Sequence, residues 1–194
     1  IAGSTGHVKG LKGKTKLLAP IMFNVIFPIS SFFKGYGATQ FIGMGENLPK
    51  NVARQWAEFC SKPGYVMNAI GKSIFDDYHQ EIQCPITSFW ASDDEIATQA
   101  NVEDLLRLYP NAKTRLIELD PRKHGYKQIG HMLMFKKSHQ KLWPVLENEL
   151  KHSLPQQYIH FYASKLVILF RCVFFSFISV HDKFHRTLIL YLFS

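Results

Sequence analysis

Cysteine is scarce in this chain, which has three in 194 residues: Cys60, Cys84 and Cys172. The number is odd, the spacing is wide and no C-x-x-C pair occurs, so neither a disulfide framework nor a zinc knuckle is expected. A reducing, intracellular setting fits this usage, and we expect the protein to be cytoplasmic. Cys60 and Cys84 lie beside apolar patterns and are predicted to be small buried hydrophobic residues.

Acidic residues are also few, since 15 Asp and Glu stand against 23 Lys and Arg, for a formal net charge of +8. A basic balance can favour nucleic acid or an anionic membrane. The basic residues are scattered, however, and no basic helix or aromatic-interleaved RNA motif occurs. We therefore expect a generic basic surface and no nucleic-acid partner. The one dense cluster, predicted to lie in a solvated loop, is Lys9, Lys12, Lys14 and Lys16.

Metal-binding motifs are missing from the sequence. No H-E-x-x-H occurs, and His124 and His131, seven positions apart in one loop, form only a weak ligand pair without clustered carboxylates. We therefore expect no metal and no cofactor. The histidines predicted to face solvent are His7, His79, His139 and His152.

The first part of the chain is predicted to be helical and irregular. Residues 14–33 are apolar but contain Pro20 and Pro28, which predict short helices broken at each proline. Residues 34–48 carry four glycines and should be irregular. Pro49 suits the first turn of an amphipathic helix, which Lys62-Pro63-Gly64 ends.

From residue 84 onward, predicted strands alternate with predicted helices. Apolar runs at 85–91 and 114–119 have the length of buried strands, a helix fits residues 97–108, and a final helix is expected to bend at Pro144. This order predicts an α/β fold of parallel βα units, with helices on both faces of an open sheet. Chemistry in such sheets gathers beyond the carboxyl ends of the strands.

Three acid–base side chains lie in the loops that leave those strands: Asp93, Asp94 and His131. Neighbouring parallel strands bring these loops to one rim, so we expect a carboxylate to meet the imidazole there. A carboxylate bound to one ring nitrogen leaves the other nitrogen free to act as a general base. Loop position alone leaves both aspartates open as the acid, and the second one would cap or turn the chain before the next helix.

These loops resemble the end of an α/β-hydrolase, which places its acid after the penultimate core strand and its histidine after the last one. Asp94-Glu95-Ile96-Ala97-Thr98 looks like the acid loop, with Thr98 where proline is common, and Ile129-Gly130-His131 looks like the histidine loop. Other segments look like the cap of a bacterial, serine aminopeptidase-like group: Gly35-Tyr36-Gly37, Gly43-Met44-Gly45-Glu46-Asn47-Leu48-Pro49, Trp56 and Pro63-Gly64-Tyr65.

The resemblance spans residues 1–152 and implies a partial α/β-hydrolase fold. Residues 1–83 would form the cap and connecting helices, and residues 84–152 the last βα units of the core. The implied activity is hydrolysis of a small-molecule ester or amide, with Asp94 as the acid and His131 as the base. The alignment of Glu95 and Ile96 with the acid loop of that family favours Asp94 over Asp93.

The sequence departs from that family at the nucleophile. The family's serine sits in G-x-S-x-G, which does not occur here, and Gly3-Ser4-Thr5-Gly6 is not such a motif. Ser30, Ser31 and Ser73 do not lie on an elbow-like turn. The resemblance therefore implies a C-terminal hydrolase fragment that is inactive alone. The alternative is a non-catalytic interaction or membrane-associated protein built on that fragment.

The composition changes after Pro155. Residues 155–194 contain no glycine and seven phenylalanines, and residues 166–180 are nearly all apolar around Arg171. This run is shorter than the roughly 20 apolar residues of a spanning helix and carries a central charge. We expect residues 153–194 to be an appended tail outside the fold, with weak membrane contact through residues 166–180.

Overall fold

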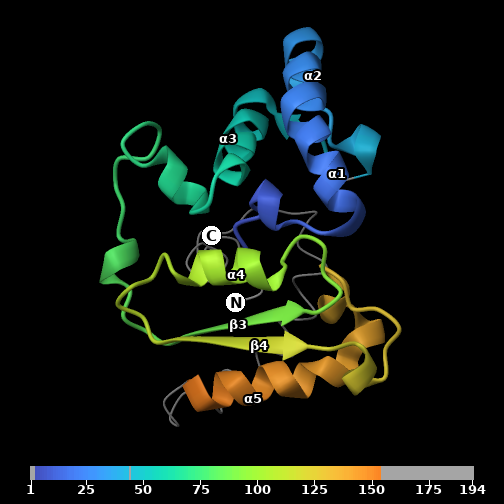
Figure 1. Cartoon of the computed structure of the whole chain (residues 1–194), viewed down its shortest axis with the longest axis vertical. Helices are drawn as coiled ribbons and strands as arrows, with labels where there is room; N and C mark the ends of the chain where they lie inside the picture. Colours follow the sequence, from blue (N-terminus) through green and yellow to red (C-terminus); the bar gives the residue numbers. More distant parts are fainter. Residues whose placement is uncertain (1–2, 44, 154–194) are drawn as a thin grey trace, which may run out of the picture.

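A computed structural model describes residues 3–43 and 45–153. The protein is a mixed structure of helices and strands with two small sheets (Figure 1). The predicted tail, except for Ser153, lies outside the described residues, and so does the predicted membrane contact through residues 166–180.

A parallel strand pair forms the lower part of the molecule in Figure 1. Strand β3 (Ile86–Ala91) pairs with β4 (Thr114–Leu119) in an unbroken register from Ile86↔Thr114 to Ala91↔Leu119. Helix α4 (Gln99–Leu106) covers one face, and α5 (Trp143–Ser153) covers the other (Figure 1). Parallel βα units with helices on both faces were predicted, and the structure confirms this arrangement.

Alternation along β3 explains why both faces are covered. Ile86 and Trp90 pack with Val102 and Leu106 of α4, while Phe89 and Ala91 point to the other face. The core on that second face also includes Leu119, Ile129, Met134, Leu142 and Leu146. Successive side chains of a strand point to opposite faces, so an apolar run without alternation needs a helix on each side.

The last helix is not bent at Pro144, as the sequence had suggested. Helix α5 begins at Trp143, directly after a 3₁₀ segment at Lys137–Leu142. Pro144 therefore lies in the first turn, where the missing N–H has no intrahelical acceptor to lose.

Residues 13–34 form one continuous helical rod, so the predicted breaks at the prolines are wrong. Helix α1 (Gly13–Ile21) runs through a π-helical turn (Met22–Ile26) into α2 (Phe27–Lys34). In the π turn the Phe27 N–H donates to the Met22 carbonyl, five residues back. Pro28 follows this turn. The backbone hydrogen bonds there already run to the carbonyl five residues back, so the helix tolerates the missing N–H of the proline.

The helical rod packs against α3 (Lys50–Ser61), which begins directly after Pro49 as predicted. Phe23 meets Trp56 edge to face at 5.3 Å between ring centroids, and Phe27 lies 5.9 Å from the same ring. By length and composition the 22-residue rod could cross a membrane, a test that the core helix of a soluble protein also passes.

The segment predicted to be irregular contains a small antiparallel ladder, β1 (Tyr36–Gly37) with β2 (Leu48–Pro49). Gly37 is needed there because a Cβ atom at that position would lie 2.6 Å from the Ala53 Cβ. Short 3₁₀ turns complete the fold at Val8–Gly10, Gln40–Ile42, Tyr65–Ala69, His79–Glu81, Arg122–His124 and Leu133–Phe135.

The two cysteines within the described residues differ in exposure. Cys60 is buried in the packing between α3 and the helical rod, and burial raises the pKa of its thiol to about 12. Cys84 is exposed, contrary to the prediction, because it lies in the turn before β3 rather than in the strand.

Candidate functional site

Asp94 lies in the turn that leaves β3, and its side chain is only 1% exposed. Its Oδ1 atom accepts hydrogen bonds from the backbone N–H of Ile96 at 2.8 Å and of Ala97 at 2.9 Å. An aspartate that binds its own following backbone in this way forms a tight local turn. The turn fixes the carboxylate and leaves its Oδ2 atom for a partner from another element.

His131 supplies that partner. Its Nδ1 lies 2.9 Å from Asp94 Oδ2, across 37 positions of sequence. A carboxylate only accepts hydrogen bonds, so Nδ1 carries the hydrogen, and in the neutral ring Nε2 is left with a free lone pair. The ring is 37% exposed, and within the described part of the chain Nε2 has no hydrogen-bond partner.

Asp93 has a different role from its neighbour. Its Oδ2 accepts from the Ile129 N–H and its Oδ1 from the Gly130 N–H, both at 2.9 Å. The carboxylate therefore anchors the backbone of the histidine loop instead of the imidazole. Gly130 is at φ +54, a left-handed conformation that favours glycine. Of the two aspartates left open by loop position, Asp94 contacts His131 and Asp93 positions the loop that carries it.

A second histidine stabilises the same loop, although it was predicted to face solvent. His139 is buried, stacks on Tyr126 with ring centroids 4.2 Å apart, and lies 2.8 Å from the Gln128 carbonyl through Nε2. Because a carbonyl only accepts, Nε2 donates, and Nδ1 accepts from the Ser138 hydroxyl at 2.9 Å. No local motif marks this role, since the partners come from the loop before His131.

The acid loop is also tied to the N-terminal segment. The Glu95 carboxylate accepts from the Thr15 N–H at 3.0 Å and from its hydroxyl at 2.8 Å, and these hydrogen bonds lower the pKa of Glu95. The Thr98 hydroxyl caps α4 by accepting a hydrogen bond from the Asn101 N–H. The same hydroxyl donates to the Gly10 carbonyl at 2.7 Å. Thr98 stands where the resembling family often has proline, and here its hydroxyl joins two segments.

The serines considered as replacement nucleophiles do not reach the imidazole. Ser30 Oγ donates to the Phe27 carbonyl and accepts from the Ala38 N–H, and Ser73 accepts from Gln55. Neither these two nor Ser31 hydrogen-bonds to His131. His124 lies in a 3₁₀ turn of the same loop, and no group of three or more possible metal ligands occurs in residues 3–43 and 45–153.

The arrangement can therefore take a proton from a hydroxyl or water placed at His131 Nε2. Asp94 would hold the ring tautomer and stabilise the imidazolium that forms. Comparisons of the chain with protein-family models, with curated proteins and with solved structures give no match.

Proposed function

We propose that this protein carries the general-base half of a serine-hydrolase-type site, for the hydrolysis of a small-molecule ester or amide. The observation that carries the proposal is the 2.9 Å contact between a buried carboxylate, Asp94, and a half-exposed imidazole, His131. The contact lies beyond the carboxyl ends of two neighbouring parallel strands. The resemblance of both loops to those of α/β-hydrolases supports the same assignment.

The proposed steps follow from the hydrogen bonds. His131 Nε2 takes the proton of an attacking hydroxyl as the oxygen bonds to the substrate's carbonyl carbon. Asp94 keeps the ring in the Nδ1–H tautomer and offsets the positive charge on the imidazolium. The imidazolium then returns the proton to the departing alcohol or amine. Two backbone N–H groups and the imidazole N–H all donate to the Asp94 carboxylate, which fixes its position beside the ring.

The proposal places the nucleophile on a different polypeptide. The sequence has no G-x-S-x-G, and Ser30 and Ser73 are engaged in other hydrogen bonds. We therefore expect the intact chain to have a competent base without a competent serine. A separate polypeptide that carries the serine would complete the site.

The experiment measures the reaction of the intact chain with p-nitrophenyl acetate, an activated ester that needs no acid to release its leaving group. Positioned general-base catalysis contributes about 10²–10⁴-fold to rate. We expect His131→Ala to lower the second-order rate constant by about tenfold or more, and Asp94→Asn to lower it similarly. The matched control is His124→Ala, a half-buried histidine of the same loop, which should leave the rate unchanged.

Two results would contradict the proposal. Equal rates for the His131→Ala and His124→Ala variants would show that the paired imidazole has no special reactivity. Labelling of the intact chain by a fluorophosphonate probe would show that it already contains an activated serine, and would overturn the placement of the nucleophile.

A further inference from the structure

The helical rod, residues 13–34, is apolar on two opposite sides. One side faces α3 and the N-terminal loop, and its buried residues are Ala19, Met22, Phe23, Phe27 and Ser30. The other side is exposed, although it is equally apolar. A helix that is hydrophobic all round is normally buried in a large core or in a membrane, so the exposed side requires an explanation.

We call that side the apolar helix face. Its members recur at spacings of three or four, which keeps them on one side of a helix. They are exposed by 47–79%, with the two phenylalanines at the end of α2 the most exposed, Phe32 at 79% and Phe33 at 77%. The apolar helix face consists of Leu17, Leu18, Ile21, Val25, Ile29, Phe32 and Phe33.

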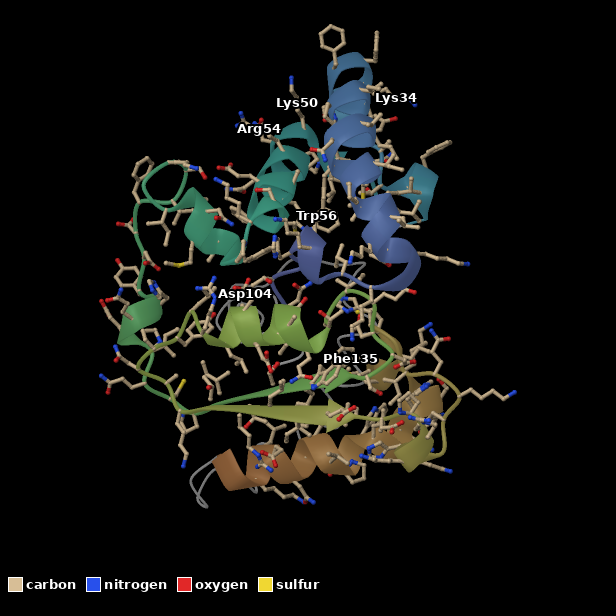
Figure 2. All side chains as sticks on the ribbon, viewed as in Figure 1. Lys34, Lys50, Arg54, Trp56, Asp104 and Phe135 are labelled. Atoms are coloured by element: carbon tan, nitrogen blue, oxygen red, sulfur yellow. The ribbon has the colours of Figure 1, made fainter. Side chains whose placement is uncertain are left out.

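Basic side chains lie at both ends of the helical rod. The first 45 residues contain five lysines and no Asp or Glu. The four lysines predicted to lie in a loop are all exposed, and two of them, Lys14 and Lys16, belong to α1 itself. At the other end Lys34 closes α2, and Lys50 and Arg54 extend from α3 toward the same end of the molecule (Figure 2).

Lys16, Lys34, Lys50 and Arg54 are exposed and form no ion pair within the described residues. An apolar strip on a helical rod with exposed lysines at each end matches the interface of an anionic bilayer. Acyl chains take up the apolar side chains there, and lipid headgroups neutralise the lysines.

We infer that the apolar helix face inserts into the interface of a membrane that contains anionic lipid. The rod is about 33 Å long at 1.5 Å per residue and lies parallel to the surface. It does not span the bilayer, because Phe23 and Phe27 on its opposite side remain packed on Trp56. Lipid is favoured over a protein partner because a leaflet offers negative charge at both ends of the rod without any specific match.

The surface is separate from the proposed hydrolase site. In Figure 1, α2 extends from the end of the molecule farthest from β4 and α5. Phe135, near the carboxyl ends of the strands, is far from Lys34 and Lys50 in Figure 2. Membrane binding and base chemistry can therefore be tested independently with variants of one protein.

The experiment measures sedimentation of the full chain with phosphatidylcholine vesicles, with and without about one-third phosphatidylserine. Burying a phenylalanine is worth about 1.5–3 kcal/mol, or at least about tenfold in partitioning. We expect Phe32→Ser and Phe33→Ser each to weaken binding by about tenfold. A basic residue near an anionic surface contributes about 1 kcal/mol, so Lys34→Gln and Lys50→Gln should each weaken it by about fivefold.

Two control variants keep the comparison specific. Phe75→Ser removes an equally exposed phenylalanine from the loop before His79–Glu81, and Lys113→Gln removes an exposed lysine before β4. Both should bind like the unaltered chain. As a second readout, Phe32→Trp should gain fluorescence that brominated lipid quenches, whereas Phe75→Trp should add fluorescence that brominated lipid leaves unquenched.

Three outcomes would overturn the inference. The first is equal binding of the Phe32→Ser and Phe75→Ser variants, which would place the contact elsewhere, for example in residues 166–180. The second is equal binding to neutral and anionic vesicles. The third is a lipid-free dimer that Phe32→Ser dissociates, because the occupant of the face would then be a second copy of the chain.

Discussion

The rim that carries Asp94 and His131 and the helical rod of residues 13–34 are stabilised by opposite kinds of interaction. At the rim, hydrogen bonds of 2.8–2.9 Å link two carboxylates, four backbone N–H groups and one imidazole. Along the rod, aromatic and aliphatic packing fixes one side and leaves the other side exposed. Hydrogen bonds specify individual positions, whereas apolar packing specifies only a face.

One loop joins the two regions. Asp94 binds the imidazole, and the next residue, Glu95, accepts two hydrogen bonds from Thr15 in the first turn of α1. A carboxylate near the amino end of a helix also interacts favourably with its dipole. Glu95 therefore ties the first turn of the rod to the loop that carries Asp94.

The largest expected effect tests the packed side of the rod against its exposed side. Phe27 is 2% exposed and Phe33 is 77% exposed on the same helix. Phe27→Ala should lower the free energy of unfolding by about 3–5 kcal/mol, whereas Phe33→Ala should change it by less than about 0.5 kcal/mol. Urea titrations followed by circular dichroism measure both. Equal losses would mean that the exposed side is covered in the isolated protein.

A smaller effect is expected at the rim. Asp93→Ala removes the acceptor of the Ile129 and Gly130 N–H groups, and Ile129 is fully buried. Leaving buried donors without an acceptor should lower the free energy of unfolding by about 2 kcal/mol. Hydrogen exchange should also speed up at these two amides. Unchanged exchange at Gly130 would show that Asp93 does not hold the histidine loop.

The smallest effect concerns a contact between α4 and the turn that follows α3. Asp104 of α4 accepts from the Gly64 N–H at 2.8 Å and from Arg107 at 2.6 Å. Burial acts to raise the pKa of Asp104, but the hydrogen bonds from Gly64, Thr5 and Arg107 outweigh it and lower the pKa overall. Asp104→Asn should therefore cost about 1 kcal/mol of unfolding free energy at neutral pH.

The stabilisation that Asp104 provides depends on pH. A carboxyl group with a lowered folded-state pKa stabilises the protein above its ordinary pKa of about 3.9, and this contribution is lost as pH falls through the lower folded value. The unaltered chain and the Asp104→Asn variant should thus converge in stability as the pH approaches 2. A difference that stays constant from pH 7 to pH 2 would contradict the assigned charge.

The sequence predicted the strands and the meeting of an aspartate with His131 because both depend on short-range patterns. Residues 85–91 and 114–119 are apolar runs of strand length, and parallel neighbours bring their following loops together. The sequence could not assign separate roles to Asp93 and Asp94 from loop position, since both follow the same strand. Their roles depend on which way each side chain points relative to a loop 36 or 37 positions away.

The predictions that failed were those that a local rule made without tertiary context. Pro28 does not end the helix because a π turn precedes it, and no local residue pattern marks such a turn. His139 is buried because Tyr126 and Gln128 lie next to it in space. The hydrolase activity, the cytoplasmic location and the fragment interpretation remain predictions.

The most direct test of the central claim is the protonation state of the His131 ring, measured by ¹⁵N NMR at a pH where the ring is neutral. We expect Nδ1 to carry the hydrogen and Nε2 to have the chemical shift of an unprotonated nitrogen. Asp94→Asn should disturb this pattern, because an amide can also donate to the ring. Hydrogen on Nε2 in the unaltered chain would rule out His131 as the general base, since the nitrogen proposed as the base would then be a donor.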